Sequence, residues 1–174
     1  SKKYREILDR KDIDAVLIGA PDHWHVPMTV DACTAGKDVY VEKPLTHNLS
    51  EGKAVIDAQN NYKRIVQVGM QQRSMPHLQK AREIIKDGTL GDIHKIHLTW
   101  NRNQLRHKPS KLNVDPKSLV WKDFLGNAKD QPFDEYRFRN WRWFWDFGGG
   151  ILTVHTLHRT YLASRPADLD EPES

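Results

Sequence analysis

Three short hydrophobic runs lie within the first 70 positions, and each one leads directly into polar residues. The runs fall within residues 13–19, 38–41 and 65–69, and they are rich in valine and isoleucine. Within the first of them, Ala15 to Ile18 is continuously apolar. Such a run is typical of a strand buried on both faces, as in a parallel sheet with helices on either side.

Helix-like patterns alternate with these runs. Residues 2–11 place apolar side chains on one helical face, and a second helix ends near Ala35 before a glycine. A third helix over 48–60 begins with Asn48 and Glu51, which have the spacing of a capping box. Helices that alternate with strands in this order predict a parallel, doubly wound α/β sheet.

The pattern changes after the mid-70s. Residues 76–87 predict another helix, and 91–103 alternate between apolar and polar side chains, as strands of antiparallel sheets do. We therefore expect a Rossmann-type domain over 1–75, followed by part of an α+β domain with an open antiparallel sheet over 76–163. Residues 164–174 are acidic and contain proline, so we expect them to be disordered.

Polar clusters follow each of the three predicted strands. They are Pro21 to His25, Glu42 to Pro44, and Gly69 to Arg73. In a parallel sheet these clusters meet at the carboxyl edge, where open α/β sheets bind ligands. Taken alone, Glu42 and Lys43 could be a surface ion pair at the end of a strand, but three clusters at one edge favour a binding site.

Composition limits the possible partners. Of the 174 residues, 38% are apolar and 29% are charged, which fits a globular protein with a core. The net charge is only +4 and no basic run occurs, so we expect neither a nucleic-acid nor a membrane partner. Cys33 is the single cysteine, which excludes an intramolecular disulfide and fits a reducing compartment.

The ordered set of motifs resembles the Gfo/Idh/MocA family of nicotinamide-dependent oxidoreductases. The matching stretches are Asp14 to His25, Val41 to Pro44, Val68 to Arg73, Gly88 to Ile93, and Trp141 to Gly150. The resemblance implies an N-terminal Rossmann domain and a C-terminal α/β domain with an open antiparallel sheet. It also implies NAD or NADP as cofactor, with NAD slightly favoured, and a parent protein that forms homo-oligomers.

Two departures from the family pattern stand out. The sequence contains no GxGxxG loop, the glycine-rich turn that binds pyrophosphate at a helix N-terminus. Val154 stands where the family usually has Asp, although His158 keeps the spacing of the family's histidine. The chain therefore resembles an internal piece of the family, and we expect it to bind dinucleotide weakly by itself.

The resemblance also implies residue roles. Lys43 and His158 match the family's catalytic lysine and histidine. The cofactor edge is matched by Pro21, Asp22, His25, Glu42, Lys43, Pro44 and Gln71. Substrate contacts are matched by Lys43, Arg73, Arg142 and His158.

Two other interpretations of these residues are weaker. His23 and His25 form a His-x-His pair that could suggest a metal, but the family uses this turn to border the cofactor, so we expect no metal site. Arginines interleaved with aromatic residues over 136–143 resemble a single-strand nucleic-acid stripe. Packing and a polyol pocket are the simpler explanation, because only this one patch is basic.

The resemblance implies hydride transfer between NAD(P) and a hydroxyl of a sugar, cyclitol or related polyol. One alternative is a glycosidase that uses tightly held NAD, as in a branch of the family, and another is a truncated chain without activity of its own. We expect a cytoplasmic protein, or a periplasmic one if a twin-arginine signal precedes this sequence.

Overall fold

The computed structural model describes residues 3–99, 114–150, 156–158 and 160. These residues fall into two compact units. The first unit holds the described residues within Ser1–Gly69 and Lys108–Ile151, and the second holds those within Met70–His107 and Leu152–Ser174. The predicted domain boundary in the mid-70s stays a prediction.

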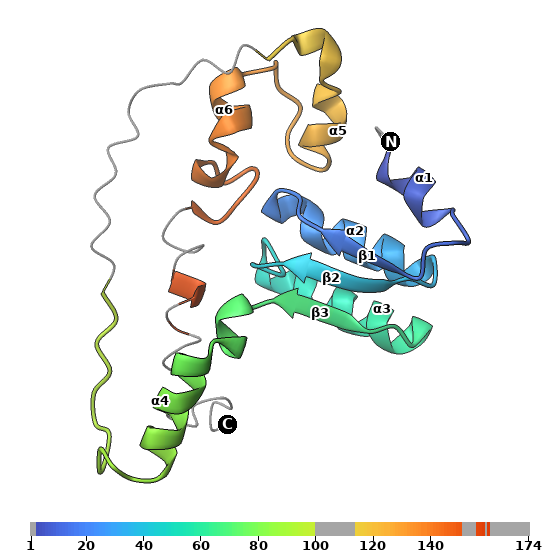
Figure 1. The fold of residues 1–174 in the computed structure, drawn as a ribbon. Helices are drawn as coiled ribbons and strands as arrows, with labels where there is room; N and C mark the ends of the chain where they lie inside the picture. Colours follow the sequence, from blue (N-terminus) through green and yellow to red (C-terminus); the bar gives the residue numbers. More distant parts are fainter. Residues whose placement is uncertain (1–2, 100–113, 151–155, 159, 161–174) are drawn as a thin grey trace. The chain divides into compact units, whose positions relative to one another are not determined.

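The first unit contains a parallel sheet, as the sequence predicts (Figure 1). Val41 in the central strand lies opposite Ile18 on one side and Val68 on the other. β-Branched side chains suit the pleated surface of such a sheet. The strands, in spatial order, are β1 (Ala15–Ile18), β2 (Asp38–Glu42) and β3 (Val66–Gly69).

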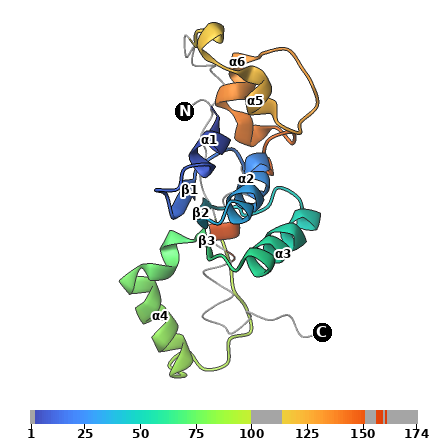
Figure 2. The same cartoon turned by 90° about the vertical axis from the view of Figure 1, so that its right-hand side faces the viewer.

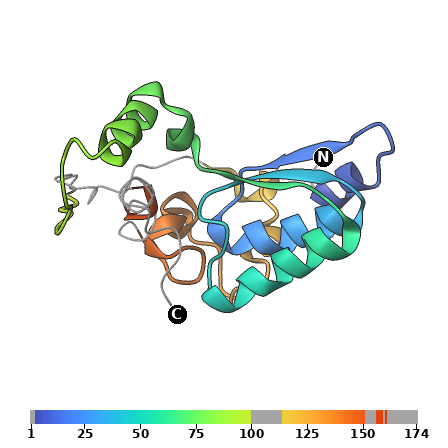
Figure 3. The same ribbon diagram turned by 90° about the horizontal axis from the view of Figure 1, so that it is seen from below.

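Helices connect these strands. α1 is short, whereas α2 and α3 lie along one side of the sheet (Figure 3). Asn48 and Glu51 form the predicted capping box in η1 (Leu49–Glu51), just before α3. Gly36 follows α2 at φ 77°, a left-handed conformation that ends helices. The helices are α1 (Tyr4–Leu8), α2 (Asp22–Thr34) and α3 (Gly52–Tyr62).

The two faces of the sheet differ, and here one prediction was wrong. Val39 and Val41 face the helices and are 3% and 0% exposed, but Leu17 is 73% exposed. Successive side chains of a strand point to opposite faces, so helices on one side bury only every second residue. Within the described residues, α2 and α3 cover one face, so β1 is not buried on both faces.

The described residues 114–150, which we call the aromatic lobe, pack against the start of α2. Helices α5 and α6 lie side by side there (Figure 2), and the rings of Phe124 and Phe138 are 4.9 Å apart. Phe147 is fully buried within the same cluster of rings. The elements of the aromatic lobe are η3 (Pro116–Ser118), α5 (Trp121–Leu125), α6 (Glu135–Arg139) and η4 (Trp141–Trp143).

The second unit contains η2 (Gln71–Ser74) and α4 (Pro76–Lys86), the latter as predicted. The predicted strand over 91–103 was wrong in its described part, because residues 91–99 form no strand. Alternation alone does not make a strand, since the backbone groups of a strand need a paired neighbour. In the part of the chain that the structure describes, each helix is too short or too polar to cross a membrane.

Candidate active site

The ends of β1 and β2 bring two charged residues to the same edge of the sheet. Pro21 precedes α2 with extended backbone, which turns the chain from β1 into that helix and makes Asp22 its first residue. Lys43 follows β2 directly, and the bond between Lys43 and Pro44 is cis. Because β1 and β2 are parallel neighbours, Asp22 and Lys43 share the edge at which such sheets bind ligands.

Asp22 is a buried carboxyl group at this edge, with only 2% of its surface exposed. Desolvation raises its pKa above the ordinary value, because burial disfavours the charged form. The positive charges of His25 and Arg142 and a hydrogen bond from the Gly149 backbone oppose that rise. Of the residues that the structure describes, none forms a hydrogen bond with the buried Oδ2 atom of Asp22.

Lys43 is half-buried beside this carboxyl group. Desolvation lowers the pKa of its ammonium group below the ordinary value. The negative charges of Asp22 and Glu42 counteract part of the shift, whereas Arg142 adds to it. Lys43 therefore lies in an environment that brings its proton closer to transfer at neutral pH.

Residues in the first turn of α2 form hydrogen bonds with the aromatic lobe. His23 Nε2 lies 2.9 Å from the carbonyl oxygen of Phe124, and Trp24 Nε1 donates to the same oxygen at 3.0 Å. The backbone N–H of His23 donates to Phe147 O at 3.2 Å. Gly126 lies so close to Trp24 that a Cβ atom there would be 2.6 Å from the ring. These contacts fix the aromatic lobe on the α/β layer.

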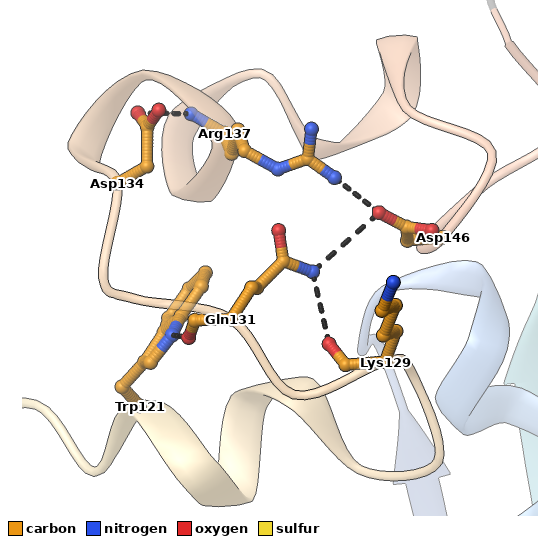
Figure 4. Close-up of polar contacts among 6 residues, drawn as sticks. All are labelled: Trp121, Lys129, Gln131, Asp134, Arg137 and Asp146. Atoms are coloured by element: carbon orange, nitrogen blue, oxygen red, sulfur yellow. Dashed lines mark hydrogen bonds and ion pairs between the residues drawn. The ribbon is translucent and has the colours of Figure 1, made fainter.

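Polar contacts inside the aromatic lobe position Asp146, which lies shortly before the three glycines (Figure 4). Arg137 forms an ion pair with Asp146, and Gln131 Nε2 lies 3.5 Å from the same carboxylate. Trp121 Nε1 donates to the carbonyl oxygen of Gln131 at 2.8 Å. The segment that ends in the three glycines is therefore held through the carboxylate of Asp146.

Gly148 lies against Asp22, which the sequence reasoning did not foresee. A Cβ atom at this position would be 3.1 Å from Asp22 Oδ2 and 3.2 Å from the ring of Trp141. Arg142 stacks on Trp141, with its guanidinium carbon 4.1 Å from the ring centroid. The run of three glycines was the available signal, because glycine permits such close backbone approach.

His25 lies at the same edge but is 1% exposed, and both ring nitrogens lie against backbone carbonyl oxygens. Its predicted contact with a cofactor stays a prediction. Burial lowers the pKa of His23, the other histidine of the pair. Within the described residues, no group of three or more metal-ligating side chains is assembled.

The remaining predicted site residues lie elsewhere. Glu42 ends β2 and is half-buried, next to Lys43. Gln71 and Arg73 lie in η2, and His158 belongs to a short helical stretch, all three in the second unit. Their grouping with Lys43 stays a prediction, and Val154 lies outside the described residues.

The parallel sheet and its charged carboxyl edge define an α/β unit of the Rossmann type. Residues 1–70 match the model of an oxidoreductase family with an NAD-binding Rossmann fold, the Gfo/Idh/MocA family. Over these residues the chain is similar to this oxidoreductase family.

Similar proteins include enzymes that act on carbohydrates. The levoglucosan dehydrogenase of Pseudarthrobacter phenanthrenivorans is 27% identical over 94% of this chain and 40% of its own length. The α-N-acetylgalactosaminidase of Shewanella oneidensis is 34% identical over 60% of this chain and 24% of its own.

A solved structure, the myo-inositol 2-dehydrogenase of Lactobacillus plantarum, matches 53% of this chain and 28% of its own at a TM-score of 0.51 and 31% identity. The chain spans about a third of the length of the curated relatives that it matches.

Proposed function

We propose that this chain is part of an NAD(P)-dependent oxidoreductase that transfers hydride between the cofactor and a hydroxyl group of a sugar, cyclitol or related polyol. One observation carries the proposal: Lys43 lies half-buried at the carboxyl edge, with its pKa lowered and the buried Asp22 beside it. Similarity to dehydrogenases of levoglucosan and myo-inositol supports the substrate class.

Lys43 would act as the acid–base group for the proton of the reacting hydroxyl group. In the oxidation direction the neutral amine of Lys43 would accept the proton of the hydroxyl group as hydride leaves, and in the reduction direction the ammonium form would return that proton to the substrate oxygen. The lowered pKa of Lys43 favours the neutral amine that this step needs, because burial disfavours the charged form. A nicotinamide cofactor held at this edge would supply the two-electron chemistry.

The residues at the edge fit the ribose and nicotinamide end of a dinucleotide. The buried Oδ2 atom of Asp22 has no partner among the described residues and could accept a hydrogen bond from a hydroxyl group. The backbone at Gly148 and Gly149 lies close to Asp22 and limits the space around its carboxyl group. The pyrophosphate end has no counterpart in this sequence, which contains no GxGxxG loop.

A second candidate is a glycosidase that oxidises its substrate transiently and restores the cofactor in each cycle. The similarity to an α-N-acetylgalactosaminidase, at 34% identity over 111 residues, is the observation that favours it. The two functions share the Lys43 chemistry and differ in net cofactor turnover.

The test is to assay the full-length enzyme that contains this sequence. We expect a panel of inositols and anhydrosugars, supplied with NAD or NADP, to yield stoichiometric reduced cofactor, followed by its absorbance. Release of sugar from a nitrophenyl glycoside without net reduced cofactor would favour the glycosidase. If the enzyme shows neither reaction with any of these substrates, the proposed function is overturned.

A further inference from the structure

Arg142 is an exposed cation of the aromatic lobe whose guanidinium group is held on an aromatic ring. Its guanidinium carbon lies 4.1 Å from the ring centroid of Trp141, the residue before it in η4. Arginine stacks on an aromatic face through its planar group, which leaves the N–H donors at the rim of that plane available to another partner. Because Arg142 is exposed, such a partner can come from solution.

The glycine backbone links this arginine to the carboxyl edge of the sheet. A Cβ atom added to Gly148 would lie 3.1 Å from Asp22 Oδ2 and 3.2 Å from the ring of Trp141, so both side chains approach the same point of the backbone. Arg142, stacked on that ring, interacts electrostatically with both Asp22 and Lys43. The guanidinium, the ammonium and the buried carboxyl group therefore belong to one site.

The two cations of this site are compensated only in part. Arg142 contributes to the lowered pKa of Lys43, because a neighbouring like charge disfavours the charged form. Burial raises the pKa of Asp22, which weakens its compensating charge. In the part of the chain that the structure describes, no carboxylate forms an ion pair with Arg142, and Asp22 Oδ2 accepts no hydrogen bond. A bound anion would offset the repulsion between the two cations, whereas a neutral group would leave it.

We propose that Arg142 selects a substrate that carries an anionic oxygen group, a carboxylate or a phosphate, on the same molecule as the hydroxyl group that reacts at Lys43. A guanidinium group donates two parallel hydrogen bonds to either oxyanion, a geometry that a single hydroxyl group does not match. Stacking on Trp141 holds the guanidinium group in place before the substrate arrives, so less conformational freedom is lost on binding. The inference rests on the proposed function for the sugar or polyol class and adds that the molecule is acidic.

The first experiment measures binding without turnover. The full 174-residue chain is titrated with D-glucuronate, D-glucose 6-phosphate or D-glucose, which differ only in the group at carbon 6. The ¹H–¹⁵N signal of the Arg142 Nε–H group, assigned by its loss in Arg142→Lys, reports the binding. We expect at least one anion to bind about tenfold more tightly than glucose, the effect of one charge-assisted hydrogen bond. The two anions distinguish carboxylate from phosphate, and equal responses to all three sugars would overturn the proposal.

Variants test whether Arg142 is the group that recognises the anion. In Arg142→Gln we expect the preference for the anion over glucose to fall by about tenfold. Arg142→Lys keeps the charge but loses the planar fork, so we expect it to retain only part of the preference. Arg139→Gln, at another exposed arginine of the aromatic lobe, is the matched control and should keep the full preference. An equal fall in Arg139→Gln would indicate general charge attraction and would contradict the proposal.

Steady-state kinetics of the full-length enzyme distinguish an acidic substrate from the phosphates of the cofactor. We expect Arg142→Gln to lower the ratio of kcat/KM for an acidic sugar to that for its neutral counterpart by about tenfold, with little change in the KM for NAD or NADP. A raised KM for the cofactor together with an unchanged ratio would assign Arg142 to the cofactor and overturn the proposal.

The outcomes separate this inference from the proposed function. Selective binding of an anionic sugar through Arg142, without hydride transfer to NAD or NADP, would support the anion site and contradict the oxidoreductase. Hydride transfer with neutral sugars and no preference for anions would support the function and contradict the inference. If Arg142→Gln does not fold, the wild-type titration with the three sugars still decides.

Discussion

The α/β layer of residues 15–69 and the aromatic lobe are held together in different ways. In the layer, β1, β2 and β3 pair through their backbones and bury Val39 and Val41 against α2 and α3. The aromatic lobe consists of short helical turns joined by ring contacts and by side-chain bonds to carbonyl groups. The layer therefore has a regular frame, whereas the aromatic lobe depends on a small number of specific contacts.

The candidate site draws on both regions. The layer supplies the groups that carry protons, Asp22 and Lys43, at the ends of regular strands. The aromatic lobe supplies Arg142 and the glycine backbone that approaches Asp22. If this division holds, changes in the layer should affect chemistry most, and changes in the aromatic lobe should affect binding and local stability.

The largest effect is expected at Lys43. In the full-length enzyme, Lys43→Ala should lower turnover by roughly two to four orders of magnitude, the usual effect of removing a positioned acid–base group. Arg142→Ala should mainly raise KM, by about tenfold, since it removes one charged contact. Steady-state kinetics of both variants measure the difference. Lys53→Ala, on the exposed face of α3, is the control, and equal losses for Lys43 and Arg142 would contradict the division of roles.

Phe147 should matter most for the stability of the aromatic lobe. It is fully buried, and its ring lies 5.3 Å from that of His23 and 5.1 Å from that of Phe124. Phe147→Ala should cost about 3–5 kcal/mol, the usual cost of emptying a large buried site. We expect tryptophan fluorescence to report early loosening of the aromatic lobe while far-ultraviolet circular dichroism retains the signal of the layer.

Val41→Ala is the matched change in the layer. Val41 is also fully buried. We expect the Val41→Ala variant to unfold in a single transition, in which tryptophan fluorescence and far-ultraviolet circular dichroism change together. Two coincident transitions in Phe147→Ala would show that the aromatic lobe and the layer unfold as one unit.

Gly126 lies where the aromatic lobe packs against Trp24 of the α/β layer, so a substitution there tests the contact between the two regions. It has φ 57°, and an added Cβ atom would lie 2.6 Å from Trp24, so Gly126→Ala combines backbone strain with a clash. Gly36→Ala has similar strain, at φ 77°, but nothing within 4 Å of the new atom. We expect thermal unfolding to show an additional loss of about 1–3 kcal/mol at Gly126, the cost of overpacking. Equal losses would mean that Trp24 moves freely aside.

The smallest effect concerns pH. The pKa of Asp22 is raised in the folded state by burial, so the folded chain keeps this proton to higher pH than the unfolded chain does. Stability should therefore fall as pH rises from about 3.8, the ordinary pKa, through the folded pKa, and then level off. Asp22→Asn should remove this fall. Unfolding midpoints of the variant and the wild type, compared from pH 3.5 to 6.5, measure it, and parallel curves would contradict the raised pKa.

The sequence by itself determined the layer and the place of its chemistry. Apolar runs near Ala15, Val39 and Ile65 predicted short strands, and the helices between them predicted parallel pairing. Parallel pairing in turn placed Asp22 and Lys43 at one edge, because every strand ends on the same side. The capping box at Asn48 followed from local hydrogen bonding, which involves only neighbouring residues.

Tertiary structure alone decided the features that depend on distant partners. The alternating pattern of 91–99 produced no strand in the described residues, because a strand exists only through a neighbour that pairs with its backbone. Leu17 proved exposed because helices cover one face of the sheet within the described residues. The two carbonyl partners of His25 follow from the folded backbone, since hydrogen bonds to Ala20 and Pro44 require two strand ends to meet around one ring.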